Sequence, residues 1–108
     1  MPFINLDQLE EKELVPGYKV KFVHSENTTT AYYHAAEGAE FPEHSHPHEQ
    51  ISNVIEGEFE LTIDGETQVL RPGVVAVIPS NAVHSGRALK PCYIMDVFYP
   101  IREDYAKS

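Results

Sequence analysis

The sequence predicts an all-β fold, either a sandwich or a barrel built from short strands. Most of the chain divides into short segments in which apolar and polar side chains alternate, which is the period of a β-strand. Turn residues separate these segments, with 6 glycines and 8 prolines among the 108 residues. Many short strands at regular spacing, punctuated by glycine and proline, are typical of β-sandwiches and β-barrels.

The length of the chain favours one domain over residues 1–108, which is enough to enclose a hydrophobic core. Its first part, residues 1–16, is expected to be an N-terminal extension without catalytic residues. Two structures are open for it. Residues 3–4 could form a short edge strand, and the acidic segment that begins at Leu6 could form one or two helical turns that stop before Pro16.

Two strands are predicted after this extension. In residues 18–23 the large apolar side chains of Tyr18, Val20 and Phe22 recur at every second position. Residues 28–36 are rich in threonine and tyrosine, which favour strands.

Four more strands are predicted in the middle of the chain, over residues 51–55, 58–63, 66–70 and 74–78. Asp64-Gly65 is a strong hairpin signal between the second and third of these. The last of the four is a continuous apolar run, which predicts a strand buried on both faces. A loop is expected after it, and this loop would present His84.

The last long strand is predicted over residues 92–99. One of its faces carries Asp96 between Ile94 and Phe98, so an ionisable group lies in a strand that should be buried. A buried, unpaired carboxylate is costly, and it needs a cation, a hydrogen-bond network or a raised pKa. Two interpretations are open: a structural role for Asp96, in a pair with Arg102 or in a backbone turn, or a role as general acid/base in a functional site.

Composition excludes several classes of partner. The chain has 8 basic and 17 acidic residues, a net charge of −9, which should repel nucleic acids and anionic membranes. No apolar run approaches the roughly 20 residues that a membrane-spanning helix needs. The first residues do not resemble a signal peptide, and the single cysteine, Cys92, cannot form an internal disulfide. We therefore expect a cytoplasmic protein.

The segment with the most candidate functional side chains is residues 38–57, GAEFPEHSHPHEQISNVIEG. Histidine is the commonest metal ligand, and side chains two residues apart on a strand point to the same face. His44 and His46 could thus bind one ion, and Gln50 could add an amide oxygen if the strand continues past Pro47. His48 has the same parity, so parity does not decide whether it is a ligand. His84 is the candidate for a further ligand.

This segment resembles the first sequence motif of the cupin family, and residues 73–88 resemble the second. The resemblance implies a single cupin domain, a jelly-roll barrel also called a double-stranded β-helix. It also implies a metal site formed by His44, His46, Gln50 and His84. The residues that fall on the motif positions are Gly38, His44, His46, Gln50 and Gly57 in the first motif, and Gly73, Pro79 and His84 in the second.

The chemistry of these four ligands limits which cofactors are possible. Three imidazoles and one amide are all neutral, so a divalent ion would keep its full charge and act as a stronger Lewis acid than beside a carboxylate. Nitrogen and oxygen ligands suit one divalent transition metal ion, namely Ni, Fe, Zn, Mn or Cu.

The C-terminal segment DVFYPIRED, together with HSHPHEQ, resembles small cupins of the pectin-degradation type. The resemblance implies an enzyme that converts 4,5-unsaturated uronates to linear 5-keto-4-deoxyuronate, and a homodimer. Carried over by position, Asp96 would be the acid/base, Arg102 would bind the carboxylate of a small anionic substrate, and Phe98 would shape the pocket wall. Arginine suits a carboxylate because it donates two parallel hydrogen bonds.

Two other functions are compatible with the same residues. One is a metal-dependent dioxygenase, which would need a redox-active metal and would consume oxygen. The other is a non-catalytic cupin that binds a sugar or another metabolite, because a fold does not determine a function.

Overall fold

The computed structural model describes residues 2–106 as ten β-strands and two short helices. The elements are η1 (Leu6–Gln8), β1 (Lys12–Val15), β2 (Tyr18–His24), β3 (Thr29–Ala35), β4 (Glu40–His44), β5 (Glu49–Glu56), β6 (Phe59–Ile63), β7 (Glu66–Leu70), β8 (Val75–Ile78), β9 (His84–Ala88), β10 (Cys92–Tyr99) and α1 (Glu103–Ala106).

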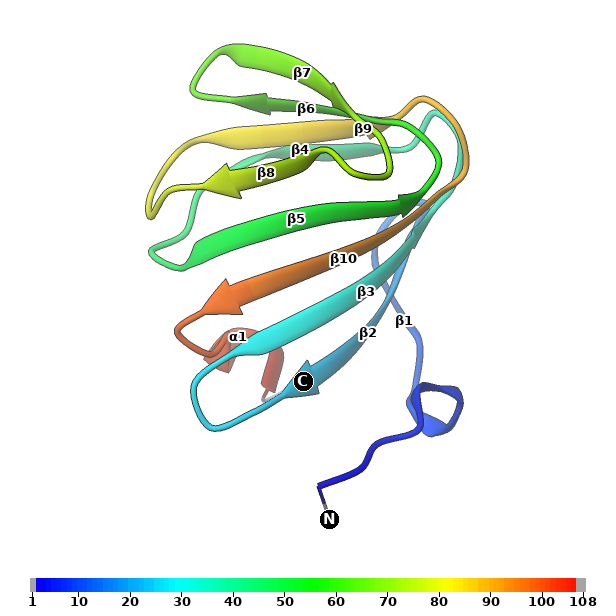
Figure 1. Ribbon diagram of the computed structural model, residues 1–108, viewed down its shortest axis with the longest axis vertical. Helices are drawn as coiled ribbons and strands as arrows, with labels where there is room; N and C mark the ends of the chain where they lie inside the picture. Colours follow the sequence, from blue (N-terminus) through cyan, green and yellow to red (C-terminus); the bar gives the residue numbers. More distant parts are fainter. Residues whose placement is uncertain (1, 107–108) are drawn as a thin grey trace.

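The strands form two antiparallel sheets that face each other (Figure 1). The larger sheet has the order β1-β2-β3-β10-β5-β8, and the smaller sheet has the order β4-β9-β6-β7. Neighbours such as β10 and β3 are far apart in sequence, so the chain crosses repeatedly between the sheets. This confirms the predicted all-β fold with the jelly-roll arrangement of a cupin.

The core fills the space between the sheets with side chains from alternate strand positions. In β10, residues 92, 94, 96 and 98 are buried, whereas the residues between them are partly exposed, as the alternation predicts. Gly86 in β9 is one place where a side chain cannot fit, because a Cβ atom there would overlap the ring of Phe59. The phenyl ring thus passes directly over the backbone of the smaller sheet.

The prediction that residues 74–78 are buried on both faces is wrong. Ile78 is buried, but Val75 and Val77 are 52% and 59% exposed. They lie in β8, an edge strand of the larger sheet, and point away from the core. An apolar run shows that each side chain is apolar but not whether a second layer covers it. In the described part of the chain, nothing packs on the outer face of β8, so its valines are exposed.

The N-terminal extension combines parts of both structures that the sequence left open. Residues 3–4 are not in a strand, and Phe3 is 85% exposed. One short helical turn, η1, is present, while the acidic segment after it forms β1 and pairs with β2. The strand is therefore at residues 12–15, because backbone pairing with β2 outweighs the weak helical preference of this segment.

The predicted strand through the histidines is interrupted. β4 ends at His44, residues 45–48 form a bend, and β5 begins at Glu49 in the other sheet. The assumption that one strand continues past Pro47 is therefore wrong. Two strands that the sequence did not reveal, β4 and β9, pair with each other and bring His44 directly opposite His84.

Candidate functional site

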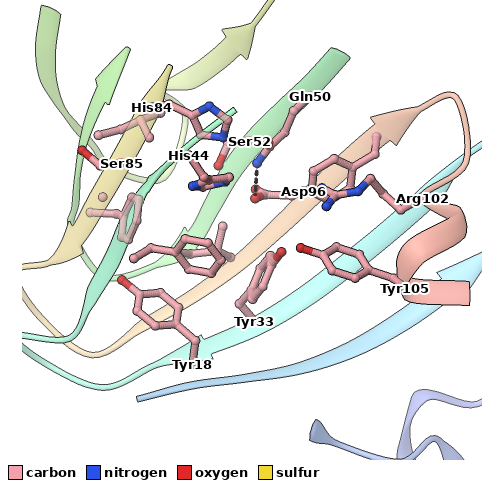
Figure 2. Close-up of a pocket in the computed structure, with 16 residues that line it drawn as sticks. Tyr18, Tyr33, His44, Gln50, Ser52, His84, Ser85, Asp96, Arg102 and Tyr105 are labelled. Carbon is pink, nitrogen blue, oxygen red and sulfur yellow. Dashed lines mark hydrogen bonds between the residues drawn. The ribbon is translucent and has the colours of Figure 1, made fainter. Parts of the chain in front are cut away.

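A pocket opens between the two sheets and contains most of the predicted site residues (Figure 2). Its polar side chains come from both sheets and from the C-terminal segment. Among its lining residues are His44, His84, Gln50, Asp96, Phe98 and Arg102. Residues that are 58 positions apart, from His44 to Arg102, therefore share one cavity.

Three histidines form the only cluster of potential metal ligands found in residues 2–106. One ring nitrogen from each of His44, His46 and His84 lies within 4.8 Å of the others. The ring centroids of His44 and His84 are 4.1 Å apart, and those of His46 and His84 are 5.0 Å apart. His46 and His84 are buried, and His44 and His84 line the pocket, so the cluster lies at the pocket wall.

The same ring atom of each histidine is held by a backbone carbonyl. Nδ1 of His44 lies 2.7 Å from the oxygen of Pro42, Nδ1 of His46 lies 3.0 Å from that of His48, and Nδ1 of His84 lies 2.9 Å from that of Ala82. A carbonyl oxygen only accepts, so each Nδ1 must carry the proton and donate it. Each Nε2 is then left with a lone pair, which is the form that binds metals.

Nε2 of His84 is buried and has no hydrogen-bond partner among the described residues. Nε2 of His46 lies 3.0 Å from Oε1 of Gln50, and both atoms are acceptors when Nδ1 carries the imidazole proton. A cation bound to both atoms would remove this conflict. Two ligand atoms about 2.1 Å from one ion, at right angles, lie about 3 Å apart. These residues therefore fit a divalent metal ion.

Burial favours the neutral form of His46 and His84. It lowers the pKa of His46 to about 4, and the positive charge of Arg102 lowers it further. Burial also lowers the pKa of His84, against the hydrogen bond to Ala82. Because a metal binds only the neutral imidazole, these lowered pKa values mean that protons compete weakly with a metal at His46 and His84.

Asp96 lies beside this cluster and is buried, with 6% of its surface exposed. Gln50 Nε2 donates to its Oδ2 at 2.7 Å. Oδ1 makes no hydrogen bond in the described part of the chain, although Ser52, its cross-strand neighbour, lies close enough to favour the ionised form. Burial raises the pKa of Asp96 to about 7 despite the contacts with Ser52 and Gln50. Such a carboxyl group can give and take protons near neutral pH.

Arg102 is buried with only 8% of its side chain exposed, and its ion-pair partner is Asp104. Its Nε and Nη2 donate to the two carboxylate oxygens of Asp104 at 3.1 and 2.8 Å. The guanidinium lies 4.9 Å from the ring centre of Phe98 and 4.0 Å from that of Tyr105. The structure therefore does not form the Asp96–Arg102 ion pair that the sequence left open.

The other histidines lie outside the cluster. His48 accepts from His46 through its backbone oxygen. His24 Nδ1 lies 2.8 Å from Oγ1 of Thr29, and His34 is exposed and pairs with Glu11. His48 thus contributes to the site by orienting His46.

Sequence reasoning did not identify Ser52, Tyr33 and Asp104 as parts of the site. Ser52 shares the parity of Gln50 on β5, so the period of the strand could have revealed it. Tyr33 lines the pocket from β3, and Asp104 reaches it through Arg102. No local pattern marks these two residues.

Comparison with known proteins places this architecture in a family. The cupin domain matches residues 31–98, which is more than half of the chain. The pectin degradation protein KdgF of Dickeya dadantii is 32% identical over 102 residues, which cover 92% of this chain and 93% of that protein.

Two solved structures show the same similarity in three dimensions. KdgF from Halomonas sp. superimposes with a TM-score of 0.87 at 33% identity, covering 95% of this chain and 97% of that one. An RmlC-like cupin from Shewanella frigidimarina gives a TM-score of 0.91 at 29% identity, over 97% and 96% of the two chains. The chain therefore belongs to the cupin family, and it is similar to KdgF pectin degradation proteins along nearly its whole length.

Proposed function

We propose that this protein is a metal-dependent enzyme that converts 4,5-unsaturated uronates to linear 5-keto-4-deoxyuronate. The observation that carries the proposal is the pocket in which a histidine cluster, Asp96 and Arg102 lie together in a chain similar to KdgF. Each group matches a requirement of this substrate, which has several oxygens, one carboxylate and a double bond that must accept a proton.

His44, His46 and His84 would hold the metal through Nε2, with Oε1 of Gln50 as the fourth ligand. A divalent ion of Ni, Fe, Zn, Mn or Cu suits this donor set. When bound, the ion would supply Lewis-acid polarisation of the sugar oxygens. All four ligands are neutral, so its positive charge would also offset the net negative charge of the protein near an anionic substrate.

Arg102 would bind the substrate carboxylate. Asp104 accepts from the Nε and Nη2 atoms on one edge of the guanidinium, so Nη1 would be the donor to the substrate, beside Tyr105. Phe98, which is 2% exposed, packs against the guanidinium and forms the adjoining wall of the pocket. The arginine is thus packed against the rings of Phe98 and Tyr105 and held on one edge by Asp104, which reduces the entropy lost when it binds a ligand.

Asp96 would transfer the proton. The conversion is an isomerisation: the anomeric hydroxyl loses a proton, the bond between C1 and the ring oxygen breaks as C1=O forms, and C4 gains a proton as C5 becomes a ketone. A group that accepts one proton and returns one needs a pKa near the working pH. Asp96 has a pKa of about 7 and an Oδ1 without a partner among the described residues, so this oxygen is available for the exchange.

The proposal is tested by adding 4,5-unsaturated galacturonate to metal-loaded protein and following the ultraviolet absorbance of the double bond. We expect rapid loss with the parent protein and a rate at least a hundredfold lower with Asp96→Asn, within the contribution typical of acid–base catalysis. A parent rate equal to the spontaneous rate would contradict the proposal.

The same samples distinguish the alternative functions. Substrate-dependent oxygen uptake, measured with an oxygen electrode, would indicate a dioxygenase. Tight binding of the sugar without any change in absorbance would indicate a binding protein. Full activity in the absence of oxygen supports the isomerisation.

The metal site has its own test. His84→Ala removes one ligand, and we expect the metal content after dialysis, measured by plasma mass spectrometry, to fall from one ion per chain to less than a tenth. His34→Ala is the matched control because His34 is exposed, pairs with Glu11 and stacks on Tyr93, outside the histidine cluster. Equal metal content in His84→Ala and the parent protein would contradict the ligand assignment.

The protein is further proposed to be a homodimer. Val77, Ile51 and Val97 pair across β8, β5 and β10 and form an apolar row on the outer face of the larger sheet. No charged residue interrupts this row, so two copies of a chain with net charge −9 could meet there without close repulsion. Light scattering after size exclusion should give twice the mass of one chain, and Val77→Lys should give one chain mass.

A cytoplasmic location is part of this proposal, since Cys92 is a free, buried thiol. No helix in residues 2–106 is long and apolar enough to cross a membrane. Fractionation of the source cells, followed by detection with an antibody, would test the location.

A further inference from the structure

We propose that the hydroxyl group of Tyr33 is a substrate-binding group that donates to the carboxylate of the bound acid beside Arg102. This inference rests on the proposed function for the identity of the acid, a uronate. It assigns a role to a residue outside the histidine cluster, Asp96, Phe98 and Arg102.

The position of Tyr33 follows from strand pairing. β3 lies between β2 and β10, and Tyr33 pairs with Val20 on one side and Ile94 on the other. Two residues earlier on the same face is Ala31, which lies directly opposite Asp96. Because alanine is small, the wall of the pocket leaves room for the long tyrosine side chain next to Asp96. In Figure 2 the Tyr33 hydroxyl points into the pocket, toward the side where Asp96 and Tyr105 lie.

The hydroxyl group of Tyr33 has no role in folding that the described residues reveal. Tyr33 is 5% exposed and lines the pocket, and none of the hydrogen bonds between the described residues involves its oxygen. Tyr18, on the next strand, provides the contrast because its hydroxyl donates to the carbonyl of Ala39 at 2.8 Å. The ring of Tyr33 packs edge-on against Phe41, at 6.3 Å between centroids, and a phenylalanine could make the same contact. The hydroxyl is therefore available to a ligand in the pocket.

The charges around Tyr33 favour a carboxylate as that ligand. Burial raises the pKa of Tyr33 well above its usual value, and Asp96 raises it further while Arg102 opposes this. The phenol therefore stays protonated and can donate at any working pH. A carboxylate has about four acceptor sites, and Arg102, whose Nε and Nη2 already donate to Asp104, can fill only some of them. Tyr33, which faces the same pocket, can supply a further donor.

The matched pair of variants for the test is Tyr33→Phe and Tyr32→Phe. Tyr32 is the next residue, but it stacks on Tyr93 on the outer face of the same sheet. With 4,5-unsaturated galacturonate, we expect Tyr33→Phe to raise KM about tenfold and to change kcat less than threefold. The lost hydrogen bond to the carboxylate would weaken the binding of the substrate and of the transition state by the same amount. The melting temperature should stay within 2 °C of the parent value, roughly the change expected when no native contact is lost. Tyr32→Phe should change neither constant, and an unchanged KM in Tyr33→Phe would overturn the inference.

A binding experiment separates this inference from the proposed reaction. Calorimetric titrations use D-galacturonate, which has the carboxylate but no double bond, and D-galactose, which lacks the carboxylate. We expect Tyr33→Phe to weaken galacturonate binding about tenfold and to leave galactose binding unchanged, as a lost charge-assisted hydrogen bond requires. If this holds in a protein without ring-opening activity, the proposed reaction fails and the role of Tyr33 stands. An equal loss for both sugars, or no binding of galacturonate by the parent protein, would overturn the role of Tyr33.

Discussion

Gln50 joins the histidine cluster to Asp96 through the two ends of one side-chain amide. Its Oε1 lies 3.0 Å from Nε2 of His46, and its Nε2 donates to Oδ2 of Asp96 at 2.7 Å. A glutamate at this position could reach the histidines with an oxygen, but it could not donate to Asp96. The amide therefore presents an oxygen to the histidine cluster and a hydrogen-bond donor to Asp96, which a carboxylate could not do together.

Gln50→Glu tests this relationship. A second carboxylate beside Asp96 would repel its negative charge and remove the hydrogen bond that favours ionisation, so the pKa of Asp96 should rise further. We expect kcat/KM for the unsaturated uronate to fall about a hundredfold at neutral pH, while the metal content is unchanged. Gln8→Glu, an exposed change of the same charge, is the control. Full activity in Gln50→Glu would show that the amide donor is dispensable.

Asp96→Asn should stabilise the metal-free protein at high pH. Burial raises the pKa of Asp96 from 3.8 to about 7, so the unfolded chain releases this proton at lower pH than the folded chain. The contribution of Asp96 to stability is therefore greatest below pH 3.8 and falls as the pH rises to about 7, by about 4 kcal/mol for roughly three pKa units. At pH 8 the buried charge of Asp96 destabilises the folded parent protein, whereas the asparagine variant has no such charge.

The measurement is urea unfolding of both proteins in a chelator at pH 4 and pH 8. The lowered pKa of His46 has the opposite effect, because it reduces the stability of the folded protein as the pH falls. Both proteins contain His46, so its contribution cancels when their stabilities are compared. We expect Asp96→Asn to be more stable than the parent at pH 8 and nearly equal at pH 4. A variant that is less stable at pH 8 would show that the carboxylate is stabilised in the folded state.

Asp104→Asn should weaken substrate binding through Arg102. Asp104 holds the guanidinium by two hydrogen bonds, although its own side chain is 57% exposed. Loss of the charge leaves the arginine less well oriented, so we expect KM to rise about three- to tenfold with little change in kcat. Glu103→Gln, the same kind of change on the preceding residue, should leave KM unchanged. A lower KM in Asp104→Asn would mean that Asp104 competes with the substrate for Arg102.

Gly86→Ala should destabilise the protein because the added methyl group would overlap the ring of Phe59. Phe59 is 6% exposed and packed in the core, so it can move only by displacing neighbours. Overpacking of this kind costs about 1–3 kcal/mol, and thermal unfolding should show a lower melting temperature. The double variant Gly86→Ala/Phe59→Leu should recover part of the loss relative to the sum of the single variants. Additive effects would contradict a direct clash.

Most strands were predictable because their evidence is local. The alternation in residues 18–23 and 92–99 reports which side chains face a core, and Asp64-Gly65 marks a turn by its backbone preferences. β4 and β9 were missed because histidine, proline, glycine and charged residues hide the period in them. Their pairing with each other stabilises them instead.

The sequence by itself determined the all-β class, the buried face of β10 with Asp96 and Phe98, and the presence of closely spaced histidines. Only the tertiary structure decided that His44 and His84 pair across two strands while His46 reaches them from a bend. It also decided that Arg102 pairs with Asp104, and that the outer face of β8 is exposed. The physical reason is that periodicity reflects the burial of each side chain along one strand. Contacts between distant strands depend on how the sheets pack, which no short segment encodes.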